Sequence, residues 1–337
     1  MKRLFCSVLL VSASLLVNAE IVNVEGICYN LNVGGSEAVV TENPDKYKGA
    51  LSVPESVLYN GVRFAVTDMD DFAFSDCKEL TFVSLPKSLS RIGNAVFRNC
   101  SGLKSVSIPK TVTSIGNYAF RGCRSLTSIT IPEGVTRIGT AAFCYCDKLV
   151  SVSIPNSVTS LGVWAFSDCY GLESVDLGNG VTSIGFEAFY GCGLKSITIP
   201  NNVTTLGEEV FRDCRNLVSA SIGTGITCIS RWAFTNCVNL KSVFIPESVT
   251  EIGFCAFGGC KNMTSITIPK SITKIGSSAF SCCSLKDIYC YASVPPVSSY
   301  DEYLKYKSIT LHVPAESIWF YKADKVWKKF KKIKAIE

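Results

Sequence analysis

A 23-residue repeat runs through most of this chain of 337 residues. Phenylalanine recurs ten times at this spacing, with one step of 22, and each copy is followed three residues later by cysteine. The ten phenylalanines are Phe74, Phe97, Phe120, Phe143, Phe166, Phe189, Phe211, Phe234, Phe257 and Phe280. A unit of this length cannot bury its own apolar face, so neighbouring copies have to stack and share one core. The sequence therefore predicts a solenoid rather than two globular domains.

One unit, residues 115–135, indicates how each copy folds. Ile129 and Ile131 alternate with hydroxyl residues, as in a strand with one buried face. Pro132 ends this strand because proline has no N–H to donate to a ladder. Further along, Gly139 is expected to give backbone freedom before the tight helical turn that holds the next phenylalanine.

The unit Ala-Phe-x-x-Cys-x-x-Leu-x-x-Ile-x-Ile-Pro-x-x-Val-x-x-Ile-Gly closely resembles the BspA-like leucine-rich repeats of bacterial surface proteins. The resemblance implies a β-rich α/β fold: a right-handed leucine-rich repeat solenoid of about ten 23-residue repeats, with a parallel sheet on the concave face. It also implies a surface adhesin that binds a host or matrix protein. Departures from the unit are few: Gly178 and Gly223 replace the proline, Ser230 the glycine and Met263 the leucine.

The two ends of the chain depart from the repeat and look like caps. We expect a signal peptide over 1–19, an N-terminal β cap with a hairpin over 20–66, the leucine-rich repeat solenoid over 67–288, and a C-terminal cap module with a helix over 289–337. In the first cap Asn60-Gly61 is a typical two-residue hairpin turn. In the last cap we expect the aromatic side chains to pack on the final repeat, with the lysines pointing outward.

The start of the chain has the three parts of a secretory signal: two basic residues, an apolar stretch over 4–17, and small residues before Glu20. The apolar stretch is too short for a membrane-spanning helix, which needs about 20 apolar residues, and no later stretch qualifies. Cys6 lies too early for a lipidation site at the cleavage point. We therefore expect a secreted, cell-surface or periplasmic protein without a transmembrane segment.

The positive charge is concentrated at the end of the chain. The net charge of +5 falls to +3 without the signal, and residues 322–337 hold seven lysines against two acids. The body carries no basic stripe, so we expect no nucleic-acid partner. Two interpretations of the lysines stay open, a contact for an anionic surface or a solvated face of the cap.

The repeat contains a column of cysteines that invites a disulfide interpretation. Export favours bridges, but equivalent side chains on stacked units point the same way, whereas a bridge needs a specific torsion and Cβ atoms about 3.8 Å apart. Free cysteine is also among the most buried residue types. We therefore expect reduced, buried thiols at Cys77, Cys100, Cys123, Cys146, Cys169, Cys192, Cys214, Cys237, Cys260 and Cys283, and a core position for Cys290.

Catalytic and metal chemistry find little support in the residues. The one histidine of the chain is His312, and no repeating nucleophilic residue is placed to face it. The Gly-x-Ser-x-Gly, P-loop and dinucleotide motifs are missing. Asp168 and Asp213 precede a cysteine and fit turns. Cys144-x-Cys146 and Cys282-Cys283 lack zinc-ligand spacing. We expect no enzyme activity, no metal and no cofactor.

The outward side of the strands is the remaining candidate for function. Its two columns are mostly serine and threonine, which either suit the crowded inside of a curved sheet or form an uncharged, hydrogen-bonding surface for a protein or glycan. Exposed aromatic residues that break the pattern are typical contact anchors. The candidate binding residues are Phe82, Ser128, Thr130, Ser151, Ser153, Asp176, Thr198, Phe244, Thr267 and Tyr289. We expect a monomer that binds a macromolecule; a structural or assembly role at the cell envelope is the alternative.

Overall fold

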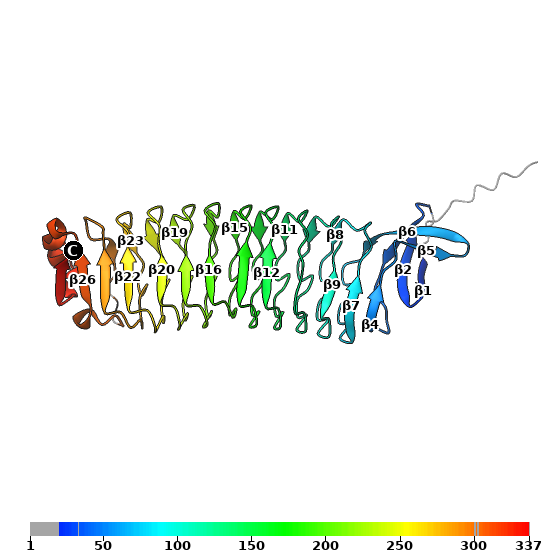
Figure 1. Ribbon diagram of the computed structural model, residues 1–337, viewed down its shortest axis with the longest axis horizontal. Coiled ribbons are helices and arrows are strands. Elements are labelled where there is room, and N and C mark those ends of the chain that lie inside the picture. Colours follow the sequence, from blue (N-terminus) through cyan, green and yellow to red (C-terminus); the bar gives the residue numbers. More distant parts are fainter. Residues whose placement is uncertain (1–19, 33, 300, 302, 337) are drawn as a thin grey trace, which may run out of the picture.

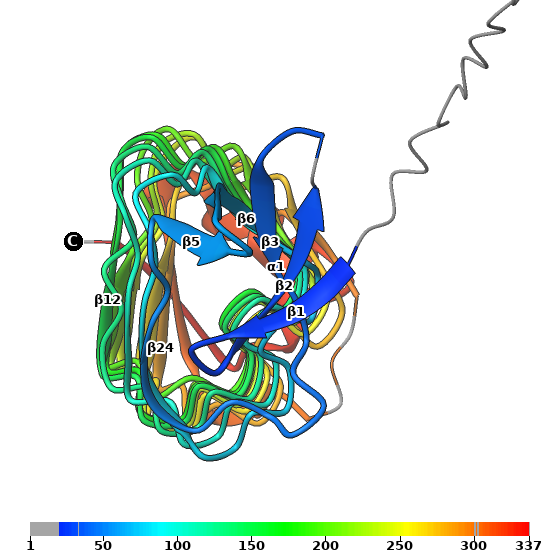
Figure 2. The ribbon, with the colours of Figure 1, turned by 90° about the vertical axis from the view of Figure 1, so that its right-hand side faces the viewer.

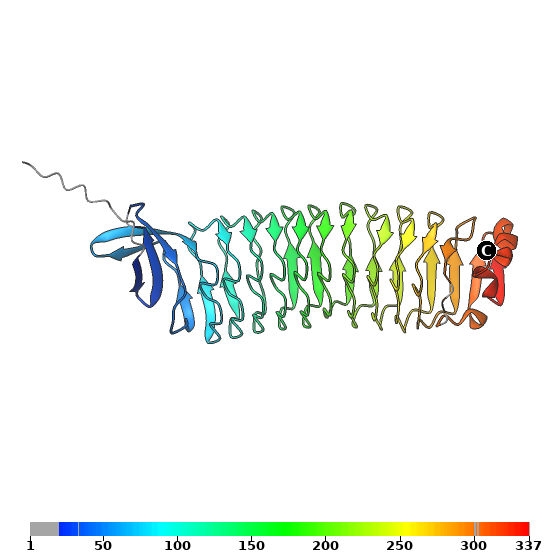
Figure 3. The same cartoon turned by 180° about the vertical axis from the view of Figure 1, so that it is seen from behind.

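A computed structural model describes residues 20–32, 34–299, 301 and 303–336. The chain forms a long rod of about 11 stacked coils, one per repeat, with a cap at each end (Figures 1 and 3). The rod bends little along its axis in these views. The fold expected from the repeat, a solenoid with parallel sheets, is confirmed. The predicted signal peptide, residues 1–19, lies outside the described residues.

Nearly every coil contributes one longer strand to a row that we call the long-strand face; this row is the lower one in Figure 1. It is divided into four parallel sheets. Their strand orders are β4-β7-β9, β12-β14, β16-β18-β20 and β22-β24-β26-β27. Residues 126–131, between β9 and β12, have no assigned strand. The bounds are β4 Gly49–Ser52, β7 Leu80–Ser84, β9 Ser105–Ser107, β12 Ser151–Ile154, β14 Ser174–Leu177, β16 Ser196–Thr198, β18 Ser219–Ser221, β20 Ser242–Phe244, β22 Ser265–Ile268, β24 Asp287–Cys290, β26 Thr310–Val313 and β27 Lys332–Ala335.

A second row of two-residue strands, the upper row in Figure 1, follows the turn after each long strand. Its parallel sheets have the orders β17-β15-β13-β11-β10-β8 and β19-β21-β23-β25. The bounds are β8 Arg91–Ile92, β10 Ser114–Ile115, β11 Arg137–Ile138, β13 Ser160–Leu161, β15 Ser183–Ile184, β17 Thr205–Leu206, β19 Cys228–Ile229, β21 Glu251–Ile252, β23 Lys274–Ile275 and β25 Val297–Ser298.

The glycine after each short strand allows neighbouring coils to approach closely. A Cβ built on Gly139 would lie 2.6 Å from the carbonyl carbon of Gly116, and one on Gly162 would lie 2.6 Å from that of Gly139. These glycines do not have positive φ, so the expectation that Gly139 supplies backbone freedom was wrong; close packing of backbones requires it. Where Ser230 replaces the glycine, the row is interrupted between β17 and β19.

The core of the rod is a continuous stack of phenylalanine rings. Nine of the ten repeat phenylalanines are fully buried, and Phe280, the last, is 5% exposed. Successive rings lie nearly parallel with centroids 5.1–5.8 Å apart. Isoleucine, leucine and valine side chains from both strand rows fill the space around the stack. Each coil therefore shares its core with its two neighbours.

The turn that joins each short strand to the next long strand, which we call the Phe–Cys turn, carries the cysteine column. The thiol of each cysteine from Cys100 to Cys283 donates to the carbonyl of the phenylalanine one coil earlier, at Sγ to O distances of 2.9–3.3 Å. The residue before the cysteine has positive φ in every coil, Asp168 and Asp213 included. The expected role of these aspartates in turns is thus confirmed.

The N-terminal cap is a five-stranded sheet with the order β1-β2-β3-β6-β5 (Figure 2). Its strands are β1 Glu20–Val24, β2 Ile27–Asn32, β3 Glu37–Val40, β5 Ser56–Tyr59 and β6 Val62–Met69. The hairpin of β5 and β6 occurs as predicted, with positive φ at both Asn60 and Gly61, and β2 and β3 form an antiparallel pair. Seen along the axis in Figure 2, these strands cross the end of the rod, where an open sheet edge would otherwise be exposed.

The C-terminal cap ends the rod with one helix, α1 Ile318–Ala323, and short 3₁₀ turns at Tyr306–Ser308, Ala315–Ser317 and Trp327–Lys329. Tyr321, Trp327 and Phe330 are buried, and Trp327 packs against both of the others. The seven lysines from Lys322 to Lys334 are all exposed. The expected arrangement, aromatic residues inward and lysines outward, is confirmed.

Two of these lysines, Lys332 and Lys334, lie on β27, which has a neighbouring strand on one side only among the described residues. Charged residues on an edge strand oppose pairing with another chain. We expect Lys332→Thr combined with Lys334→Thr to promote end-to-end association, measured as a rise of mass with concentration by light scattering. Lys241→Thr with Lys270→Thr, which removes the same charge from exposed positions of the body, should leave the mass unchanged.

Candidate functional site

All ten predicted binding residues lie on the long-strand face and point away from the core. The strands alternate exposed and buried residues, so that Ser151 and Ser153 are exposed while Val152 and Ile154 are buried. Eight of the ten residues are exposed, and Phe82 and Tyr289 are half-buried. Parallel pairing keeps the two columns aligned from coil to coil. The structure therefore brings these residues onto one surface.

The middle of this surface is almost uncharged. Serine and threonine occupy most positions, and the Oγ of Ser153 lies 3.4 Å from the carboxylate of Asp176 on the next strand. Phe244, at the end of β20, is 63% exposed and pairs with Ser221 on one side. An isolated phenyl ring among hydroxyl groups is the most apolar contact point of this face.

The C-terminal end of the long-strand face differs from the sequence interpretation. Tyr289 was expected to be an open contact anchor, but its ring stacks on the imidazole of His312, with centroids 4.4 Å apart. His312 Nε2 lies 2.9 Å from Asp287 Oδ1. The three side chains come from the paired strands β24 and β26 and form one packed cluster. Replacing Tyr289 would therefore disturb the cap as well as any ligand.

None of the 16 cysteines of the described residues forms a disulfide. Cys290 is buried in the core as expected, and its Sγ lies 3.2 Å from the hydroxyl of Tyr321. Burial raises the pKa of the Cys123 and Cys237 thiols well above the usual range. These buried thiols are poor nucleophiles and poor metal ligands, since both roles require the thiolate.

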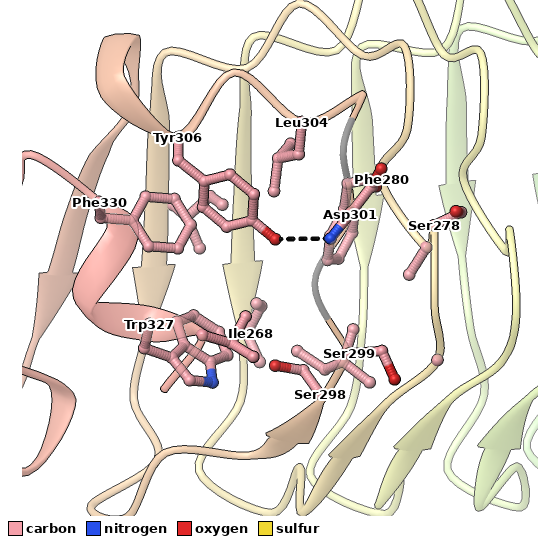
Figure 4. Close-up of a pocket in the computed structure, with 15 residues that line it drawn as sticks. Ile268, Ser278, Phe280, Ser298, Ser299, Asp301, Leu304, Tyr306, Trp327 and Phe330 are labelled. Atoms are coloured by element: carbon pink, nitrogen blue, oxygen red, sulfur yellow. Dashed lines mark hydrogen bonds between the residues drawn. The ribbon is translucent and has the colours of Figure 1, made fainter. Parts of the chain in front are cut away.

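A small, partly open pocket of about 40 Å³ lies between the last coil and the C-terminal cap (Figure 4). Its walls are mainly apolar and include Phe280, Trp327 and Phe330. Asp301 at its edge accepts a hydrogen bond from Ser281 Oγ at 2.6 Å, and its N–H donates to the Tyr306 hydroxyl. Ordinary small-molecule sites are roughly ten times larger, so this cavity has room for only a few water molecules.

Two further features are absent from the part of the chain that the structure describes. No cluster of three or more histidine, cysteine, aspartate or glutamate side chains could hold a metal ion. No helix there is long and apolar enough to cross a membrane.

A second surface with side chains suited to binding was not singled out from the sequence. On the Phe–Cys turns of neighbouring coils, Tyr118, Tyr145 and Trp164 line one open hollow together with Arg121, Asp168 and Glu187. Tyr118 and Trp164 each lie two residues before a repeat phenylalanine. Because they share this position in the repeat, the sequence could have indicated that both lie on the same side of the rod. The convergence of their rings with Tyr145 depends on side-chain positions that the repeat does not reveal.

Stacked coils of 23 residues, each with a parallel strand and a shared core, define a leucine-rich repeat solenoid. The family described as "BspA type Leucine rich repeat region (6 copies)" matches residues 67–195 and 182–301. This match covers well over half of the chain, which therefore belongs to the BspA-type leucine-rich repeat family.

Several solved structures are similar to the chain. A leucine rich cell surface protein from Faecalibacterium prausnitzii A2-165 is 26% identical with a TM-score of 0.55, over 94% of this chain and 95% of that one. A leucine-rich repeat protein from Bacteroides ovatus is 24% identical with a TM-score of 0.43, over 94% and 100%. The T. pallidum Leucine Rich Repeat protein is 28% identical with a TM-score of 0.47, over 66% and 92%. No curated protein matches the chain.

Proposed function

We propose that this protein is an exported, non-catalytic binding module whose long-strand face holds a macromolecule, either a protein or a glycan, and that it acts as an adhesin. The observation that carries the proposal is the face itself: two aligned columns of exposed hydroxyl side chains with Phe244 projecting from them. Such a surface offers many hydrogen bonds without a charge to desolvate, and an exposed aromatic ring can anchor the contact.

The proposed location is the cell surface or periplasm. Residues 1–19 have the pattern of a secretory signal. The similar protein from Faecalibacterium prausnitzii is described as a cell surface protein. Fractionation of the cells that produce the protein tests this location. We expect the chain outside the cytoplasm and without residues 1–19.

Replacement of the exposed ring tests the binding face. We expect Phe244→Ser to weaken capture of whichever ligand is found on an array of purified matrix proteins and glycans at least tenfold, because central aromatic anchors dominate binding energy. Its melting temperature should change little, since the ring is exposed. Val297→Ser serves as the control: Val297 is 73% exposed but lies on the short-strand row. Unchanged capture by Phe244→Ser would remove the long-strand face as the site.

A structural or assembly role is the second candidate. The edge of β27, which has a neighbouring strand on one side only among the described residues, offers backbone groups for pairing, although its two lysines oppose that contact. In that case the protein would form a defined oligomer or filament. Light scattering of the chain without residues 1–19 separates the two candidates, because the binding module is expected to be a monomer.

A further inference from the structure

The Phe–Cys turn contains two backbone positions with positive φ in every coil. At the position before the cysteine, eight of ten residues are glycine, asparagine or aspartate, which tolerate this conformation. At the position two residues before the phenylalanine, φ is 50–66° and none of the ten is glycine, asparagine or aspartate. Phe72, Tyr118, Trp164 and Trp232 are among its occupants. Bulky residues in this conformation cost of order 1 kcal/mol or more each, so they call for a role beyond folding.

Three aromatic residues with positive φ converge on one surface hollow. Tyr118, Tyr145 and Trp164 have φ of 58°, 61° and 56° and line the same hollow on three successive coils. Tyr118 and Trp164 remain 37% and 39% exposed. On the coil between them, the equivalent position is occupied by Ala141, which is buried. The two rings are therefore not separated by a third exposed side chain from this position. We call these residues, with Arg121, Asp168 and Glu187, the aromatic hollow.

The rings of the aromatic hollow are held in place by polar contacts. The guanidinium of Arg121 lies 5.9 Å from the ring centroid of Tyr118 and 5.7 Å from that of Tyr145. Trp164 Nε1 donates to Glu187 Oε2 at 3.0 Å, and the indole meets Phe186 edge-on. Held rings lose little conformational entropy when they bind a ligand.

The charge of the hollow favours a basic ligand. Asp168 and Glu187 place two carboxylates at its lining, and Arg121 is the guanidinium of the lining. The guanidinium of Arg124 also lies 5.8 Å from the Tyr145 ring centroid, but it is paired with Asp147. Each carboxylate already accepts hydrogen bonds from neighbouring side chains and keeps further acceptor lone pairs for a ligand. Carboxylate oxygens accept hydrogen bonds from a ligand lysine or arginine, and an arginine can also stack on an aromatic face.

The spacing of the rings matches one extended conformation of a polypeptide. Stacked phenylalanine rings in these coils are 5.1–5.2 Å apart, so equivalent positions on alternate coils are about 10 Å apart. One turn of a polyproline II helix, three residues, spans about 9.3 Å. Phe72, which is 45% exposed, occupies the same repeat position two coils before Tyr118, as Tyr118 does two coils before Trp164. The coils between carry alanine at this position, Ala95 and Ala141.

We propose that the aromatic hollow and its continuation toward Phe72 bind a proline-rich polypeptide segment in the polyproline II conformation that carries basic side chains. Proline rings pack between the exposed aromatic rings, as in other aromatic-lined grooves for such segments. Basic side chains reach Asp168 and Glu187. This site is separate from the long-strand face, so it adds to the proposed function and does not depend on it.

Calorimetric titration of the whole chain with a peptide of five Pro-Pro-Arg repeats tests this proposal. We expect saturable one-site binding to this peptide. A Gly-Gly-Arg peptide of equal length, which is equally charged but flexible, and a Pro-Pro-Glu peptide, which has the same conformation and the opposite charge, should each bind at least tenfold more weakly. A β-linked hexasaccharide represents the glycan alternative and should not bind here.

Matched variants locate the site. Trp164→Ala should weaken Pro-Pro-Arg binding at least tenfold, and it should fold normally because alanine occupies the same backbone position at Ala95 and Ala141. Trp232→Ala removes an aromatic residue from the same column outside the hollow and should leave binding unchanged. Phe244→Ser on the long-strand face should also leave it unchanged. The proposal is overturned if the Pro-Pro-Arg peptide does not bind, if Gly-Gly-Arg or Pro-Pro-Glu binds equally well, if the hexasaccharide binds and Trp164→Ala weakens that binding, or if Trp164→Ala has no effect on Pro-Pro-Arg binding.

Discussion

Phe166→Ala is expected to lower the free energy of unfolding by about 3–5 kcal/mol. Phe166 is fully buried in the middle of the rod, and its ring stacks on Phe143 at 5.1 Å and on Phe189 at 5.5 Å. The substitution leaves a cavity that neighbouring coils can fill only by breaking their own register. Urea unfolding followed by circular dichroism measures the change.

Two matched substitutions separate the stack from other effects of losing a phenylalanine. Phe280→Ala, at the end of the stack, removes a ring with one stacked neighbour, 5.8 Å away, and should cost less than Phe166→Ala. Phe244→Ala removes a ring that is 63% exposed and should change stability by no more than about 0.5 kcal/mol. Equal losses for Phe166→Ala and Phe280→Ala would show that the stack does not distribute stability through neighbouring coils.

The core and the strand rows could be predicted from the sequence because they follow directly from the period. A residue type that recurs every 23 positions occupies the same place in every coil, so ten phenylalanines and ten cysteines had to form two columns. Alternation within each long strand then determined which side chains face outward. This is why all ten candidate binding residues, from Phe82 to Tyr289, lie on one face.

Contacts that depend on the geometry between coils could not be predicted in the same way. Tyr289 is covered by His312 because β26 of the cap continues the sheet in register, and no repeat extends that far. The role of Gly139 depends on a distance between the backbones of two coils. In the aromatic hollow, Tyr145 joins Tyr118 and Trp164 although it occupies a different position in its repeat. Each of these requires side-chain or backbone geometry across coils.

The cysteine column illustrates how a periodic feature acquires a physical explanation only from the structure. The sequence predicted buried, unbridged thiols because equivalent side chains point the same way. The structure adds that each thiol from Cys100 onward donates to a phenylalanine carbonyl one coil earlier. This carbonyl also accepts the N–H of the cysteine in its own turn, as Phe166 does from Cys169. The column thus links successive turns by hydrogen bonds without covalent bridges.

Stability should fall steeply as the pH rises above about 8.5. Burial is the largest cause of a raised pKa for five column thiols, Cys123, Cys146, Cys192, Cys214 and Cys237. Their folded-state pKa lies above the unfolded value of about 8.5. Their contribution is therefore fully present below that pH and is lost as the pH rises, because only the unfolded chain releases the protons. At about pH 8.5, where half of each unfolded-state thiol is ionised, each thiol should cost about 0.7 kcal/mol per pH unit; the slope approaches about 1.4 kcal/mol per thiol, or about 7 kcal/mol per pH unit for all five, toward about pH 9.5.

Urea unfolding under reductant between about pH 7 and 9.5 measures this slope; below about pH 10 free tyrosine side chains in the unfolded chain remain largely protonated. Cys123→Ala combined with Cys237→Ala should reduce the slope near pH 9.5 by close to about 2.8 kcal/mol per pH unit, because two fewer protons are released. Phe244→Ala, which removes an exposed side chain that does not titrate, should leave it unchanged. A flat profile over this range, or an equal slope in the double variant, would mean that the buried thiols do not control the alkaline limit of the fold.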